Sequence, residues 1–209
     1  GVMIQIQNII TKCKDIIVSN NWVTEKEWVN LLSENSGTRL SLNLATLSAY
    51  YALAKLIIYI GIKPKIVAGE ELGEYVAAGV AGLFSLEDML YMIHNKTLQK
   101  DSILNALSKV TIKVSHSIEF QASSSNPHKA GSHNYWVFHC NQLGNNPEKI
   151  IRKYNGTCSL IIGVSSFIQD HSTVFAALGR NDEGINNRLP LIISYLYAHR
   201  DQVNRRAAV

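Results

Sequence analysis

A short apolar run that meets a glycine-flanked turn constrains the fold of this chain more than any other feature of its sequence. The run Lys65–Ala68 is followed at once by Gly69-Glu70-Glu71-Leu72-Gly73. Small residues come next, at Ala77, Ala78, Gly79 and Ala81. A buried strand, a tight turn and a helix that can lie close to a sheet form the strand–turn–helix elbow of α/β proteins. We therefore predict an α/β layered domain.

Helical spacing of apolar residues predicts a long core helix just before this turn. Leucine, isoleucine and alanine recur every three or four positions from Leu42 to Ile60. Gly61 is expected to end the helix, and Pro64 forbids its continuation. A polar Asn43 and a charged Lys55 interrupt the apolar stretch, so a buried helix is favoured over a membrane span.

Two capping signals predict further helices, one beginning after Thr24 and one after Ser85. Two β-branched runs, Thr111–Val114 and Ser159–Val164, are expected to be strands, the second a central parallel strand. Helices that alternate with short apolar strands are typical of an α/β sheet flanked by helices.

The length and composition of the chain favour one domain over two. Its 209 residues are 46% hydrophobic, enough for one sizeable core, and we expect a single domain over 1–209. About 100–145 is expected to be irregular. Within it, Gln121–Ser132 is rich in serine, asparagine, proline, histidine and glycine and is expected to be a loop.

The charge and the cysteines exclude some classes of protein. The formal net charge of +4 is scattered, without the dense basic stripe of a nucleic-acid binder. The three cysteines, Cys13, Cys140 and Cys158, have no metal-binding spacing and are expected to be reduced thiols of a cytoplasmic protein. No secretory signal is recognised at the start of the sequence, which supports the same expectation.

The turn and its surroundings resemble the acyltransferase domains of modular polyketide synthases and the related malonyl transacylases. The segments that carry this resemblance are Ala52–Lys55, Gly61–Pro64, Gly69–Gly82 and Phe84–Asp88. Weaker similarity follows at Val114–Glu119, Tyr135–His139, Ser159–Val164 and Leu178–Arg180. The family elbow reads Gly-His-Ser-x-Gly-Glu-Tyr.

The resemblance implies a truncated α/β-hydrolase-like acyltransferase core, with a short parallel sheet flanked by helices. The ferredoxin-like small subdomain of the family would be missing, because only about Lys100–Ser108 is left to hold it. The Gly-Gln-Gly-Ser segment that forms the family's oxyanion site is also absent from this sequence.

The same resemblance implies that the residues of the family's active site have been replaced. Glu71 stands at the position of the nucleophilic serine, and Glu70 at that of the histidine before it. Glu119 stands at the position of the general-base histidine, and Asn95 near that of the arginine that binds the malonyl carboxylate. A carboxylate is a weak acyl nucleophile, and a second carboxylate repels it where a base would activate it.

We therefore expect a pseudo-acyltransferase, not an enzyme, with no cofactor and no metal. The resemblance implies a place inside a polyketide synthase, next to ketosynthase and acyl carrier protein domains, in a synthase served by a trans-acting acyltransferase. The domain would be a structural spacer or a docking surface for the carrier protein or for that trans-acting enzyme. Neither nucleic acid nor a membrane is expected as a partner.

Three alternatives remain open from the residues. Glu70, Glu71 or Glu119 could serve a repurposed enzyme in hydrolysis, decarboxylation or proton transfer on a carrier-bound acyl chain. Glu71 and Glu119 could form a carboxylate dyad, which requires burial and proximity. The domain could also be an interaction module for one specific partner. A metal site formed by His128, His133, His139 and Cys140 is disfavoured, because their spacing fits no zinc pattern.

Overall fold

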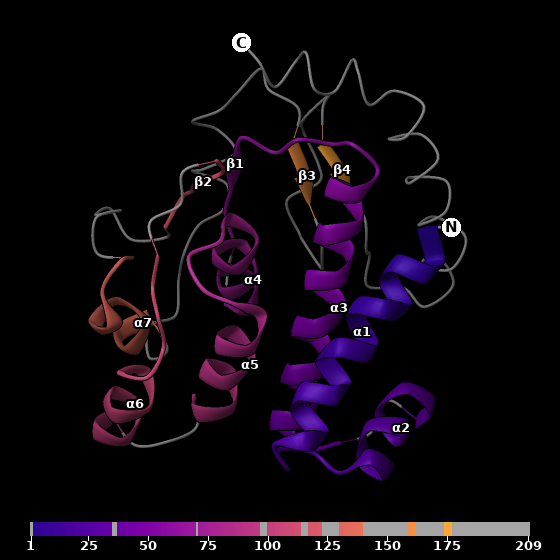
Figure 1. Cartoon of the computed structure of the whole chain (residues 1–209), viewed down its shortest axis with the longest axis vertical. Coiled ribbons are helices and arrows are strands. Elements are labelled where there is room, and N and C mark those ends of the chain that lie inside the picture. The colour runs from indigo at the N-terminus through magenta and orange to yellow at the C-terminus, as the bar shows by residue number, and fades with distance from the viewer. Residues whose placement is uncertain are drawn as a thin grey trace.

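The described part of the chain is mixed α/β and mostly helical (Figure 1). The computed structural model describes residues 2–34, 37–69, 71–96, 100–113, 117–122, 130–139, 159–161 and 174–176. The helices are α1 (Val2–Ser19), α2 (Glu25–Glu34), α3 (Arg39–Tyr59), α4 (Leu72–Ala81), α5 (Leu86–Asn95), α6 (Lys100–Leu107) and α7 (His133–His139). The strands are β1 (Ile66–Val67), β2 (Glu119–Phe120), β3 (Ser159–Ile161) and β4 (Val174–Ala176).

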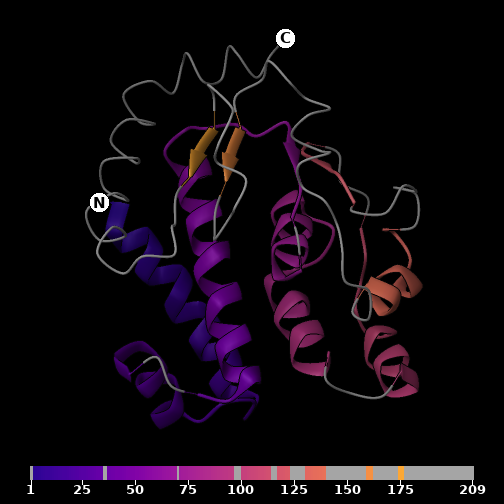
Figure 2. The ribbon, with the colours of Figure 1, turned by 180° about the vertical axis from the view of Figure 1, so that it is seen from behind.

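Helix α3 is the central element of the helical part. It packs against α1 and α2 on one side and against α4 and α5 on the other, and α6 and α7 continue the arrangement beyond α5. Figure 1 shows this order from one side of the molecule, and Figure 2 shows the same order from behind. The core is formed where these helices meet, so the predicted long core helix is confirmed.

The apolar character of α3 is explained by this packing. By length and composition alone the helix could cross a membrane, but half of its most apolar stretch is buried inside the protein. Leu44, Leu47 and Leu56 are fully buried. A helix that is apolar nearly all round is expected where neighbours cover several of its faces.

The end of α3 is a glycine cap of the predicted kind. Gly61 adopts a left-handed φ of 99° and its N–H donates to the carbonyl of Ile58 at 3.0 Å. The N–H of Ile62 donates to the carbonyl of Ile57 at 3.2 Å. These two bonds form a Schellman motif, which satisfies carbonyls that the helix itself leaves without a donor.

Both predicted helix starts are confirmed. The hydroxyl of Thr24 accepts a hydrogen bond from the N–H of Glu27 at 3.2 Å at the start of α2. Before α5, the Ser85 hydroxyl accepts from the N–H of Asp88 at 3.0 Å, and the Asp88 carboxylate accepts from the N–H of Ser85 at 3.4 Å. The second arrangement is a complete capping box.

Both sheets of the described residues are parallel pairs. Strand β1 confirms the run Lys65–Ala68, and it pairs with β2 in the register Ile66 to Glu119 and Val67 to Phe120. Strands β3 and β4 form the other pair. Of the strand expected over Ser159–Val164, the first three residues form β3. Strand β3 pairs with β4 in a sheet of two strands, and so it is not a central strand among the described residues.

Two expectations for the middle of the chain were wrong. Residues 111–113 form no strand, since the N–H of Lys113 donates at 2.6 Å to the carbonyl of Leu83 in a loop. The region 100–145 contains the helices α6 and α7. Helix α6 forms because Ile103, Ala106 and Leu107 have helical spacing and bury one face in the core.

Candidate functional site

The turn between β1 and α4 has the backbone of a sharp strand-to-helix elbow. Glu71 sits directly before the first residue of α4 with φ 50° and ψ −114°. A residue other than glycine at positive φ is strained, and sites of this kind cost about 1–3 kcal/mol each. Such strain persists only where the surroundings impose it, and it is concentrated at functional turns.

Of the two glycines that flank this turn, one lies directly against the start of α4. A Cβ on Gly69 would lie 2.0 Å from the carbonyl carbon and oxygen of Gly73 and 2.4 Å from the nitrogen of Glu74. Gly69 is therefore glycine because the backbone of α4 passes directly against it. A Cβ on Gly73 would meet nothing within 4 Å. The two glycines thus have different roles, and only the first closes the elbow.

The side chain of Glu71 points into solvent at the N-terminal end of α4. It is exposed and forms no capping hydrogen bond with the helix. A negative charge near a helix N-terminus is favoured by roughly 0.3–1 kcal/mol, so the place of Glu71 at the start of α4 needs no catalytic explanation. Glu70 lies outside the described residues.

Glu119 lies on the strand next to the elbow strand. Its N–H donates to the carbonyl of Lys65 at 2.7 Å, and its side chain is exposed. Because β1 and β2 run in the same direction, Glu119 is level with Ile66, whereas Glu71 follows the far end of β1. The fold places the two segments next to each other, but it does not bring the two carboxylates together as a buried pair. The burial that a carboxylate dyad requires is missing at both positions.

Asn95 is the last residue of α5, and its side chain bonds to its own helix. It is 9% exposed, and its Nδ2 donates to the carbonyl of Tyr91 at 2.8 Å. The next residue is a cation that sequence reasoning overlooked. The Nζ of Lys96 lies 5.5 Å from the centre of the Tyr75 ring, in the first turns of α4. A basic side chain therefore lies over the elbow helix at Lys96, one position after Asn95, the residue near the family's arginine position.

A buried carboxylate in the first turn of α4 was also overlooked. Glu74 is fully buried, and the hydroxyl of Tyr135 on α7 donates a hydrogen bond to its Oε1. Charged residues are almost never fully buried unless polar groups meet them. The available signal was an acidic residue inside a helix of otherwise small and apolar residues.

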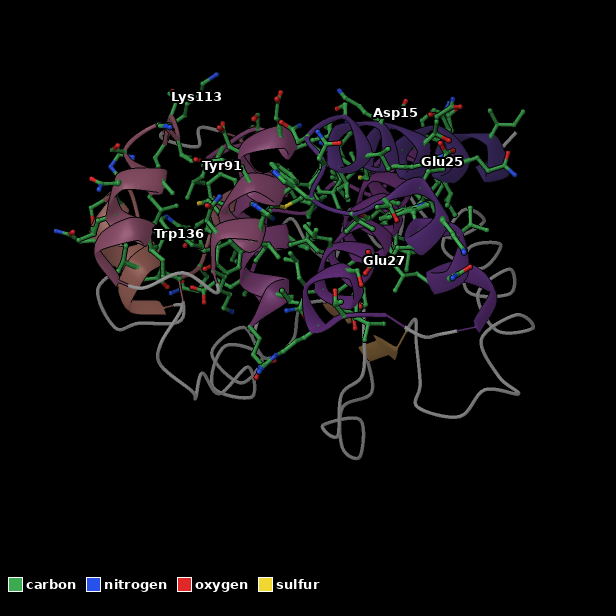
Figure 3. All side chains as sticks on the ribbon, turned by 90° about the horizontal axis from the view of Figure 1, so that it is seen from below. Asp15, Glu25, Glu27, Tyr91, Lys113 and Trp136 are labelled. Atoms are coloured by element: carbon green, nitrogen blue, oxygen red, sulfur yellow. The ribbon has the colours of Figure 1, made fainter. Side chains whose placement is uncertain are left out.

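Trp136 anchors α7 to the elbow helix and its neighbours. Its indole is fully buried, and Nε1 donates to the carbonyl of Ala130 at 2.9 Å. Figure 3 shows Trp136 between α7 and the helices α4 and α5. Rings that lie 5.1–5.9 Å from it, centre to centre, are those of Tyr75, Phe84, Phe120 and Tyr135. The segment Tyr135–His139, which carries one of the weaker similarities to the family, thus holds an aromatic anchor for the elbow.

The histidines considered as metal ligands are placed only in part. His133 begins α7, and its Nε2 lies 2.9 Å from the carbonyl oxygen of Val110. His139 ends the same helix, while His128 and Cys140 lie outside the described residues. Among the described residues, no three His, Cys, Asp or Glu side chains gather as a metal site would require.

Comparison with known proteins gives partial matches to non-reducing polyketide synthases. The chain is 44% identical over 61 residues to a non-reducing polyketide synthase of Gibberella zeae, which covers 29% of this chain and 3% of that protein. It is 34% identical over 91 residues to one of Aspergillus terreus, covering 41% of this chain and 4% of the relative. A third, from Cladonia grayi, is 37% identical over 93 residues, covering 42% and 4%.

These matches show which proteins the chain resembles and how much of each protein the similarity covers. No family model matches the chain, and no solved structure matches it. The chain spans only 3–4% of the length of these three relatives. Over the shared part, it is similar to regions of fungal non-reducing polyketide synthases, which are far larger than this chain.

Proposed function

We propose that this chain is a catalytically inactive, acyltransferase-like part of a polyketide synthase that acts as a structural spacer or docking surface. The observation that carries the proposal is that the backbone of the elbow is retained, while its tip holds a glutamate where the family has a serine nucleophile. Glu71 stands at the strained tip, in the conformation that exposes a nucleophile in the α/β-hydrolase elbow, but it presents a solvated carboxylate.

The chemistry of the tip supports the absence of acyl transfer. Transfer from a thioester needs a nucleophile, a base within hydrogen-bond reach and donors for the developing oxyanion. Attack by the Glu71 carboxylate would give an anhydride, which water hydrolyses. The residue proposed at the base position, Glu119, is a carboxylate level with Ile66 and not with the tip.

The packing around the elbow supports a structural role. Gly69 closes the turn on α4, Glu74 meets Tyr135, and Trp136 fills the space beside them. These contacts keep the fold of the elbow without any use of its tip. On this proposal the domain's partners are the neighbouring ketosynthase and carrier protein domains of the synthase, and a trans-acting acyltransferase where the synthase uses one.

Acyl loading tests the catalytic half of the proposal. Purified protein is incubated with malonyl-CoA and its intact mass is measured, with and without a carrier protein. We expect no acyl adduct on either protein, and a stable adduct on the chain would refute the proposal. Glu71→Gln serves as the matched variant: a repurposed enzyme loses a measurable turnover in this variant while its melting temperature stays the same.

Deletion of the domain from the intact synthase tests the structural half. Loss of product with an intact oligomer indicates recruitment of a carrier protein or of a trans-acting enzyme. Collapse of the adjoining ketosynthase indicates packing. A synthase that assembles and forms product normally without this segment would contradict both roles.

A further inference from the structure

The turn after α1 fixes one aromatic ring in place. Asn21 adopts a left-handed φ of 56°, and its N–H donates to the carbonyl of Val18 at 2.9 Å. The N–H of Trp22 donates to the carbonyl of Ile17 at 3.1 Å. These bonds form a Schellman motif with asparagine in the left-handed position. The backbone of Trp22 is therefore set by α1 itself.

His94 lies flat against the ring of Trp22. The two ring centres are 4.8 Å apart and the planes differ by 13°. Tyr91, labelled on α5 in Figure 3, lies one turn earlier on the same helix, with its ring centre 6.1 Å from that of Trp22. The contact joins the turn between α1 and α2 to the last turn of α5. The stack of these rings therefore links the α1–α2 turn to the end of α5, in addition to the packing of the hydrophobic core.

The Nδ1 nitrogen of His94 is buried in the interior. It makes no hydrogen bond with any residue in the part of the chain that the structure describes. Burial lowers the pKa of His94 below its ordinary value of 6.5. Protonation places an N–H on both ring nitrogens, and the one on Nδ1 would have no acceptor. An imidazolium over an indole also gains a cation–π attraction, which opposes this cost.

Burial is the cause of the lowered pKa of His94, and no charged side chain among the described residues contributes to it. On His94's own helix the ionisable neighbours are Glu87, Asp88, Tyr91 and, directly after it, Lys96. Helices α1, α3, α4 and α6 pack against α5, and among the described side chains α6 carries no titratable group. The titratable groups of the described side chains on α1, α3 and α4 are Lys12, Cys13, Lys14, Asp15, Arg39, Tyr50, Tyr51, Lys55, Tyr59, Glu74 and Tyr75.

We propose that the stack of His94 on Trp22 is a pH-sensitive latch, which holds the last turn of α5 on the α1–α2 turn while His94 is neutral and releases it when His94 is protonated. Lys96 directly follows the released turn and lies over Tyr75 in the elbow helix. Mild acid therefore loosens the α5 side of the elbow. The latch is independent of the proposed spacer or docking role.

The sign of the stability change follows from the lowered pKa. The unfolded chain binds a proton at His94 at a higher pH than the folded chain does. The contribution of neutral His94 is therefore complete above pH 6.5 and is lost as the pH falls through and below that value. A neutral aromatic ring at this position keeps the stack without the titration.

The test follows the Trp22 signal and the amides of α5 in the whole chain. Tryptophan emission is recorded from about pH 8 to about pH 5 for the wild type, His94→Phe and Trp22→Phe. Hydrogen exchange of the last turn of α5 is measured over the same range. We expect a wild-type transition with a midpoint below 6.5, loss of amide protection on its acid side, and neither change in His94→Phe.

Two controls keep the result specific. His133→Gln removes the other described histidine whose ring contacts are known, and it should keep the transition. Trp22→Phe should remove the optical transition but retain the pH-dependent exchange. A wild-type midpoint at or above 6.5 would overturn the proposal, since protonation would then tighten the stack. Equal pH dependence of exchange in the wild type and His94→Phe would overturn it as well.

Discussion

The hydroxyl of Tyr135 donates a hydrogen bond to the carboxylate of Glu74, and both side chains are buried. The two residues are 61 positions apart and belong to α7 and α4. The bond therefore ties the elbow helix to the aromatic anchor on its far side. It is a buried polar contact within the hydrophobic cluster around Trp136.

Removing the hydroxyl group of Tyr135 should destabilise the protein without changing its fold. Tyr135→Phe takes a donor away from a buried carboxylate, which costs about 1–3 kcal/mol. For a chain of this size we expect the melting temperature to fall by roughly 2–4 °C for each kcal/mol. Thermal unfolding followed by circular dichroism measures the change. Glu74→Gln keeps an acceptor for the phenol and should cost less than Glu74→Leu; the reverse order would show that the hydrogen bond contributes little.

The two glycines of the elbow should respond to alanine in opposite ways. Gly69→Ala places a Cβ against the backbone of Gly73, where no side chain can move aside, and should destabilise by about 3 kcal/mol or more. Gly73→Ala points a Cβ into open space near the start of α4 and should be neutral or stabilising by about 0.5–1 kcal/mol. Urea denaturation of the two variants gives the comparison. Similar losses in both would contradict the close contact at Gly69.

Relief of strain at the tip should stabilise the protein. Glu71→Gly removes the cost of a positive φ, and we expect a gain of about 1 kcal/mol. Glu71→Ala removes the same carboxylate but keeps a Cβ at that φ, so it should give little or no gain. Denaturant midpoints separate the two effects. If alanine stabilises as much as glycine, the carboxylate and not the backbone is the source of the strain.

Trp136 should be the most sensitive position of the aromatic anchor. Trp136→Ala leaves a cavity among four rings and removes the donor to Ala130, at a cost of about 3–5 kcal/mol. Trp136→Phe keeps part of the volume and should cost less. Near-ultraviolet circular dichroism reports the loss of ordered packing, and urea denaturation reports its size. A loss below about 1 kcal/mol in the alanine variant would show that α7 is not an anchor.

The elbow could be predicted because its signals are local. A turn that closes on a helix needs a glycine such as Gly69 at the point of contact, and the capping residues Thr24 and Ser85 stand next to the helices they start. The strand expected at Thr111 failed because a strand requires a partner, and periodicity does not reveal one. Helix α6 is only two turns long, so its pattern at Ile103 and Leu107 was easily overlooked.

The candidate site was predictable only where one segment formed it. The position of Glu71 followed from the turn itself, whereas the offset of Glu119 from the tip depends on the register of β1 and β2. The contact of Glu74 with Tyr135 joins residues far apart in sequence, which no local pattern encodes. Asn95, named near the family's arginine position, bonds to its own helix, and only the packing of α5 on α4 shows that Lys96 after it lies over Tyr75.

The close approach at Gly69 has an evolutionary consequence. The shape of the turn depends on what stands two residues before its tip, and the residue at the tip touches solvent. A substitution at position 71 can therefore replace one exposed side chain with another while the backbone of the turn stays intact. Loss of a reaction at such a turn need not unfold the protein, and a lineage can retain the scaffold long after its chemistry has gone.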